Sequence, residues 1–181
     1  MSANSDDVMG RLFARRVVLA SGPLDPELVD VVTAQLLTLD ADDDRPIELL
    51  LDCAQAEIDA AFALLDVCDG LSAELTVVVQ SRLAGAGLAL LTTRHRRLAR
   101  PHATLQLSQP RFEPANGTAD HIARVAAAHN SRVGVLIERL SERTTRPTTI
   151  IADDMERGTY LTAEQAVAYG LVDAVLQRTP N

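Results

Sequence analysis

Short apolar runs alternate along the chain with longer segments in which apolar residues recur every three or four positions. The apolar runs predict buried strands, because a strand covered on both faces shows no polar alternation. The spaced segments predict helices that bury one side. In the first half of the chain, the predicted strands are residues 16–20, 47–51 and 75–79, and the predicted helices are residues 26–39, 58–70 and 84–91. This order is typical of an α/β fold with a largely parallel sheet.

The second half of the chain contains the longest helical pattern. Residues 104–108 alternate between apolar and polar and predict a half-exposed strand, which is followed by a turn-rich loop at 109–117. Helical spacing then continues over residues 118–143, about seven turns, and a helix this long in a small domain is expected to project. Residues 162–170 carry a capping box and a final glycine, which predict a last helix before a short strand at 171–175.

Composition limits the classes of function. The chain has 181 residues, of which 47% are hydrophobic and 23% are charged, as in a single globular domain. Its net charge of -8 disfavours binding to nucleic acid or to an anionic membrane, because both require a concentrated basic surface. The one basic run, residues 94–97, is expected to be a solvated turn.

Several residues that could carry chemistry lack the spacing for it. Cys53 and Cys68 are too few for a disulfide framework and lack metal-site spacing, which favours a reducing compartment. His121 and His129 are two turns apart in the long helical pattern, not at the i, i+4 spacing of a helical metal pair. No apolar run reaches the roughly 18 residues of a membrane span, and the first residues are acidic. We therefore expect a cytoplasmic protein with no metal and no cofactor.

Three segments, in this order, resemble the Clp protease proteolytic subunit (ClpP, peptidase S14) family: residues 11–19, 34–39 and 160–173. The match spans Asp7 to Leu176 with almost no gaps. The resemblance implies the ClpP/crotonase-like fold, a β-β-α superhelix with a protruding handle helix, here residues 118–143. It also implies heptameric rings that stack in pairs as tetradecamers and receive unfolded polypeptide from a Clp ATPase.

The same resemblance divides the chain into a short flexible N-terminus at 1–10, a ClpP-like domain at 11–176 and a tail at 177–181. Family members usually carry a longer N-terminal segment, which forms the axial loops that meet the ATPase. They also often have an arginine before the catalytic aspartate that pairs across the ring interface, and here that place is held by Asp153. Adjacent acids repel rather than bridge, so Asp153 bears on ring assembly. The shorter N-terminal segment of this chain bears on ATPase docking.

The family cuts polypeptide with a Ser-His-Asp triad, and the resemblance places all three positions in this chain. The serine position falls on Gly85 and the histidine position on Ser108, while the aspartate is retained as Asp154. Glycine has no atom that can attack a carbonyl. A serine hydroxyl cannot accept a proton near neutral pH as imidazole does. The triad is therefore predicted to be degenerate.

A glycine-rich turn holds the oxyanion in the family, and Gln55 and Ala56 replace its two glycines here. Residues with a Cβ atom do not freely adopt positive φ, and removing one oxyanion donor commonly costs about 100- to 1000-fold in rate. We therefore interpret the chain as a ClpP-like pseudoprotease. It would be a structural or regulatory ring subunit that assembles alone or with active ClpP paralogues and works with a Clp ATPase.

Two alternatives stay open. The first is an active ATP-dependent Clp-type serine endopeptidase, or another hydrolase with a relocated site drawn from Cys53, Ser81, His102 and Ser108. His102 and Ser108 share a strand face, but six residues span about 20 Å, so these side chains cannot touch directly. The second is crotonase chemistry, which we rank below the pseudoprotease because no glycine-rich acyl-CoA loop is visible in the sequence.

Overall fold

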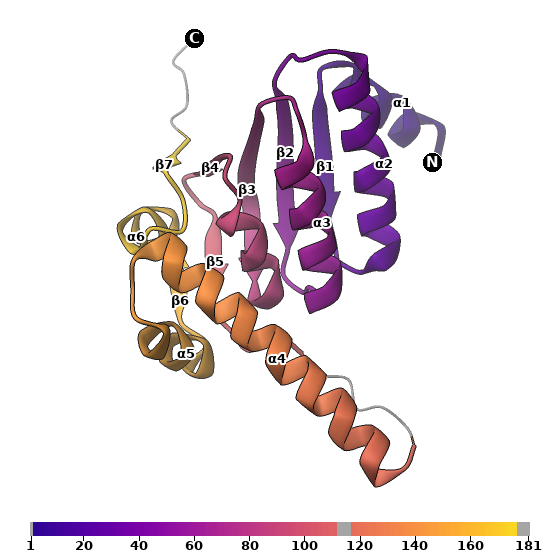
Figure 1. Cartoon of the computed structure of the whole chain (residues 1–181). Helices are drawn as coiled ribbons and strands as arrows, with labels where there is room; N and C mark the ends of the chain where they lie inside the picture. The colour runs from indigo at the N-terminus through magenta and orange to yellow at the C-terminus, as the bar shows by residue number, and fades with distance from the viewer. Residues whose placement is uncertain (1, 112–116, 177–181) are drawn as a thin grey trace.

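The computed structural model describes residues 2–111 and 117–176, with side chains from residue 8 onward. It contains a seven-stranded sheet with helices around it (Figure 1). The strands are β1 (Val17–Ser21), β2 (Ile47–Cys53), β3 (Leu75–Ala84), β4 (Arg96–Ala99), β5 (Thr104–Gln106), β6 (Tyr160–Thr162) and β7 (Ala174–Val175). The helices are α1 (Ser2–Ala14), α2 (Pro26–Asp42), α3 (Ile58–Gly70), the 3-10 helix η1 (Gly85–Thr92), α4 (Ala119–Thr144), α5 (Thr148–Arg157) and α6 (Ala163–Tyr169).

The sheet is parallel except for β6, which pairs antiparallel with β5. Its main path runs β1-β2-β3-β4-β7, and β5 pairs with β3 beside this path. β3 is long enough to serve two neighbours, since residues 76–79 pair with β4 and residues 82–84 pair with β5. The predicted α/β class with a largely parallel sheet is confirmed, and β3 and β5 end at the same edge.

One face of the sheet carries the main core, and α2 and α3 cover it (Figure 1). The buried side of α2 consists of residues at helical spacing: Val29, Val32, Leu36 and Leu39. Asp25 caps α2, because its carboxylate accepts a hydrogen bond of 2.9 Å from the Leu28 backbone N–H. Pro26 then fits the first helical position, where no N–H is needed. The helix begins where its sequence predicts.

Helix α4 projects from the body, as its long pattern predicts (Figure 1). The residues of α4 that are buried all lie in its second half: Val133, Leu136, Leu140 and Thr144. Two arginines fix this half to α3, because Arg132 pairs with Asp59 at 2.7 Å and Arg139 pairs with Asp69 at 3.6 Å. The first half of α4 therefore extends beyond the core.

Four elements have no counterpart among the sequence predictions: α1, β4, α5 and β6. Helix α1 spans most of the residues 1–10 that we assigned to a short flexible N-terminus, and the tail at 177–181 lies outside the described residues. The helix expected at 84–91 is a 3-10 helix, which has tighter turns than an α-helix. Gly85 and Gly87 disfavour an α-helix at its start.

The basic run at 94–97 is not the solvated turn that we expected. Its second half begins β4, and Arg97 is only 4% exposed. The Arg97 guanidinium forms an ion pair with Asp173 and donates hydrogen bonds to the carbonyl oxygens of Leu91 (3.0 Å) and Leu171 (2.9 Å). Arg94 and Arg96 are exposed as expected, but the expectation was wrong for Arg97, because Asp173 lies 76 residues further along the chain, where local sequence cannot reveal it.

Candidate functional site

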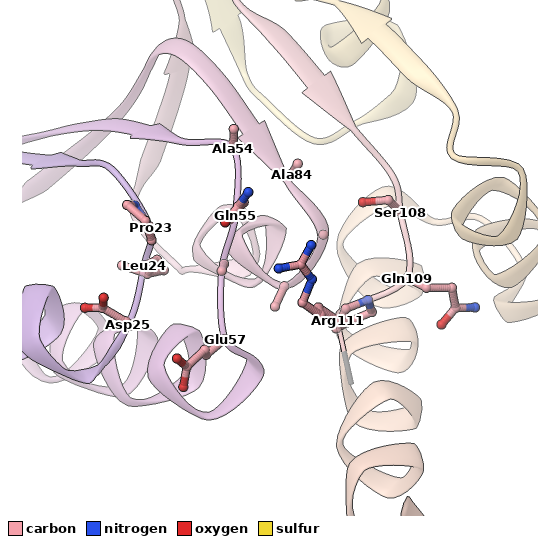
Figure 2. A pocket seen from close by; sticks show the side chains of 14 residues that line it. Pro23, Leu24, Asp25, Ala54, Gln55, Glu57, Ala84, Ser108, Gln109 and Arg111 are labelled. Atoms are coloured by element: carbon pink, nitrogen blue, oxygen red, sulfur yellow. The ribbon is translucent and has the colours of Figure 1, made fainter. Parts of the chain in front are cut away.

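A cavity of about 220 Å³ lies where four strands end (Figure 2). Ligands of parallel α/β sheets bind at this edge, outside the carboxyl ends of the strands. The cavity is lined by the segments that follow β1, β2, β3 and β5, namely residues 23–25, 54–57, 84–86 and 108–111. Segments distant in sequence thus supply one site.

Gly85 and Ser108, the predicted serine and histidine positions, lie side by side in this cavity. Gly85 has a φ of +55°, and a Cβ atom added to it would lie 3.4 Å from the Ser108 Oγ. That distance is ordinary van der Waals contact, so a Cβ atom has room at Gly85, but any side chain there would be strained by the left-handed backbone. Among the described residues that line the cavity, Ser108 carries the one hydroxyl, and none is a histidine.

Asp154, the predicted aspartate position, lies in α5 and is held by other partners. Its carboxylate accepts hydrogen bonds from the Tyr169 hydroxyl (2.6 Å), the Arg157 guanidinium (2.6 Å) and the Thr159 hydroxyl (3.3 Å). Burial raises the pKa of Asp154, but the hydrogen bonds from Tyr169 and Arg157 outweigh burial and hold that pKa below its usual range. Asp154 is not among the described residues that line the cavity.

Tyr169 allows this network to be tested by spectroscopy. Burial, followed by the hydrogen bond to the Asp154 carboxylate, raises the pKa of Tyr169 well above its ordinary value of 10.0. In a Tyr160→Phe variant, which leaves Tyr169 as the one tyrosine of the chain, we expect tyrosinate absorbance only in strongly alkaline solution. Because the folded pKa of Tyr169 is raised, the protonated phenol stabilises the folded protein. This contribution to the free energy of unfolding is complete below about pH 10 and is lost as the pH rises through the folded pKa.

The control for this titration is Asp154→Asn in the same Tyr160→Phe background. Removing the negative charge beside the phenol should bring the Tyr169 transition back toward its ordinary pH, because the tyrosinate no longer meets a carboxylate. An identical titration curve in the two variants would mean that Asp154 does not control Tyr169.

The turn that replaces the glycine-rich loop is docked against the segment after β1. The Leu24 N–H donates to the Gln55 carbonyl oxygen at 2.9 Å, and the Glu57 N–H donates to the Leu24 carbonyl oxygen at 2.9 Å. Leu24 and Ala56 also form a parallel β-bridge. Neither Gln55 nor Ala56 has positive φ. The loop is therefore held in ordinary backbone geometry by its own neighbour.

Arg111 is a cavity residue that the sequence did not single out. Its guanidinium points into the cavity, which Asp25 and Glu57 also line (Figure 2). The available signal was its place three residues after Ser108, the predicted histidine position. Arginine stays protonated at physiological pH, so Arg111 can bind an acidic group but cannot act as a general base.

The residues considered for a relocated site are not brought together in the cavity. Cys53 is fully buried, its thiol is 3.5 Å from the Ala20 carbonyl oxygen, and burial raises the pKa of the thiol to about 11. Ser81 and His102 are exposed, and of the four candidates only Ser108 lines the cavity. Within the part of the chain that the structure describes, no three His, Cys, Asp or Glu side chains are grouped to hold a metal ion.

The fold and this strand-end site define a class of α/β protein with a projecting helix beside the sheet. A family model described as Clp protease matches residues 1–179, so the chain belongs to the Clp protease family. It is similar to an ATP-dependent Clp protease proteolytic subunit of Ligilactobacillus salivarius (strain UCC118), with 29% identity over 175 residues, covering 94% of this chain and 88% of that protein. No helix in the described ranges is long and apolar enough to cross a membrane.

Proposed function

We propose that this chain is a Clp protease family member without catalytic activity, a pseudoprotease. The observation that carries the proposal is the pairing of Gly85 with Ser108 at the strand-end cavity. Covalent catalysis at this place needs a nucleophile activated by an adjacent base. Gly85 supplies no nucleophile, and Ser108 supplies a hydroxyl with no histidine among the described lining residues to activate it.

The remaining groups of the site support the same proposal. Asp154 accepts hydrogen bonds from Tyr169, Arg157 and Thr159, and none of these donors is a histidine. In the Gln55–Ala56 turn, the Gln55 carbonyl oxygen accepts a hydrogen bond from the Leu24 N–H, and both residues have negative φ. A loop that stabilises an oxyanion must instead direct backbone N–H groups toward it. These parts act together on one transition state, so the loss of the nucleophile or of the base alone removes most of the catalysis.

A scaffold that keeps its fold while losing its chemistry fits an assembly role. We propose that the protein forms a ring, alone or together with active ClpP paralogues, and there affects ring stability, peptide access or the docking of a Clp ATPase. The cavity, which Arg111 also lines, is then a place where a peptide can lie without being cut. Co-purification with an active Clp subunit from the source cytoplasm would support mixed assembly.

The catalytic part of this proposal is tested by peptide hydrolysis. The purified protein should cleave fluorogenic peptides and unfolded casein no faster than buffer, because it lacks nucleophile and base, while an active Clp protease subunit assayed in parallel cleaves both. Ser108→Ala and Asp154→Asn should leave this background unchanged. A rate above background that disappears in Ser108→Ala would contradict the proposal and identify Ser108 as a relocated nucleophile.

A further inference from the structure

A second pocket lies between helix α4 and the end of η1. It has a volume of about 210 Å³ and is lined by Thr92, Arg139, Glu142 and Arg143. None of these residues lines the strand-end cavity. Arg139 and Arg143 are four residues apart on α4, so their side chains lie on the same side of the helix. We call this place the α4–η1 pocket, and its lining carries two guanidinium groups and one carboxylate.

Arg139 is positioned at the pocket by two weak contacts. Its Nε–H donates to the Thr92 hydroxyl oxygen at 3.3 Å, and the Thr92 hydroxyl in turn donates to the Ala89 carbonyl oxygen at 2.7 Å. Its Nη2 lies 3.6 Å from Oδ2 of Asp69, beyond hydrogen-bond distance. The other Asp69 oxygen already accepts a hydrogen bond of 2.6 Å from the Thr93 hydroxyl. The Arg139 guanidinium therefore keeps donors that no described residue uses.

Arg143 is paired even less completely. It forms an ion pair of 3.5 Å with Asp173, whose carboxylate accepts a closer hydrogen bond of 2.7 Å from the Arg97 backbone N–H. The Nε–H of Arg143 is buried and has no hydrogen-bond partner among the described residues. A buried donor without an acceptor is costly, so such groups usually have a partner. Arg143 thus lacks acceptors for a charge that lies partly inside the protein.

A neighbouring cation adds to this lack of acceptors. Burial, and after it the positive charge of Arg97, lower the pKa of Arg143, while Asp173 raises it. Two cations share one carboxylate here, and a second anion beside Arg143 would lessen their repulsion. Arginine presents its donors in a fork that matches the oxygens of phosphate and carboxylate groups. A phosphate group carries close to two negative charges at neutral pH, so it matches two guanidinium groups better than a carboxylate does.

We infer that the α4–η1 pocket is a binding site for a phosphate group, either as the free ion or as part of a phosphate monoester. Arg139 and Arg143 supply the charge-assisted hydrogen bonds. Glu142, also in the lining, opposes the anion, but it is exposed and can turn toward water. The site goes beyond the proposed function, because it shares no lining residue with the strand-end cavity.

Isothermal titration calorimetry of the full chain with inorganic phosphate tests the site, at constant ionic strength because salt screens such charges. We expect saturable binding, which Arg139→Met and Arg143→Met should each weaken about 10-fold or more, since hydrogen bonds to a charged group are lost. Glu142→Gln should instead tighten binding about 2- to 5-fold, because it removes a like charge from the pocket. Acetate, a single carboxylate, should bind more weakly than phosphate.

Arg124→Met is the matched control, because Arg124 is exposed on the projecting half of the same helix. It should bind phosphate like the wild type. Circular dichroism checks that every variant is folded, and Glu142→Gln, a change at an exposed residue, tests the site even if an arginine variant does not fold. Glycerol 3-phosphate is titrated in parallel. If it binds as well as phosphate, the pocket accepts a phosphate monoester, and if phosphate alone binds, the ligand is the free ion.

Several results would overturn the inference. One is the absence of saturable binding up to about 10 mM phosphate. Another is equal affinity in the wild type and in both folded arginine variants, or an affinity that Glu142→Gln leaves unchanged, because the phosphate would then bind elsewhere on the surface. Acetate binding as tightly as phosphate would assign the pocket to carboxylates instead. None of these results bears on peptide hydrolysis, so the pseudoprotease proposal is judged independently.

Discussion

An Arg97→Met variant should lose about 3 kcal/mol of unfolding free energy, the largest stability change that we expect from one side chain. Methionine keeps much of the length of arginine but removes the charge and all five donors. The carbonyl oxygens of Leu91 and Leu171 would lose their partner in the interior, and each buried polar group left unpaired is costly. Asp173 is 39% exposed and can recover water, which keeps the loss at the low end of the range for buried pairs.

Thermal unfolding measures this loss, at roughly 2–4 °C for each kcal/mol in a chain of this size. Arg82→Met is the matched control, since Arg82 is exposed and its change should be within about 0.5 kcal/mol. Equal unfolding temperatures for the two variants would show that the Arg97 contacts do not hold the C-terminal segment to the sheet.

The Arg97 network also explains an acid dependence. Burial raises the pKa of Asp173, but hydrogen bonds and charge from Arg97 outweigh it, so the folded pKa is below its usual range. A depressed folded pKa means that the stabilisation is present above the unfolded value, about 3.9, and is lost as the pH falls through the folded value. The Arg97→Met variant should therefore lose less stability than the wild type between neutral and acid pH.

Sequence patterns predicted those parts of the fold that depend on local order. The strand at 47–51 and the helix that follows it are visible because their buried residues recur at fixed spacing. Helix α5 escaped prediction because only Ile151 and Met155 of its ten residues are buried, too few to form a clear period. The burial of Arg97 was not predicted because its partners are far away in the sequence, and a basic run alone indicates an exposed segment.

The candidate site was likewise predicted only in part from the sequence. The resemblance to the family located Gly85 and Ser108, and the structure places these two residues in contact distance of one another. The surroundings of Asp154 could not be predicted, because Tyr169 reaches it from another helix and Thr159 from the turn after α5. The docking of Gln55 on Leu24 depends on a backbone contact between two loops, which leaves no side-chain pattern in the sequence.

Restoring the nucleophile and base alone should restore little activity. In Gly85→Ser with Ser108→His, the two new side chains are neighbours, since a Cβ at residue 85 lies 3.4 Å from the present Ser108 Oγ, but the serine would hold strained left-handed backbone geometry. The histidine would lack its orienting acid, because Asp154 is held by Tyr169 and Arg157. Losing that orientation costs about 10,000-fold in serine proteases. We expect this double variant to cleave fluorogenic peptides at a rate barely above buffer.

Adding Gln55→Gly and Ala56→Gly to the double variant should raise the rate about 100- to 1000-fold, the value of an oxyanion donor. Glycines free the turn to adopt positive φ and to leave its hydrogen bond with Leu24, so that a backbone amide can face the developing charge. Ala54→Gly in the same background is the matched control, since it loosens the same loop outside the two predicted positions. If the control gains as much as the glycine pair, general loosening of the loop explains the effect. If the double variant already cleaves peptide well above the buffer rate and as fast as the quadruple variant, the turn does not limit catalysis.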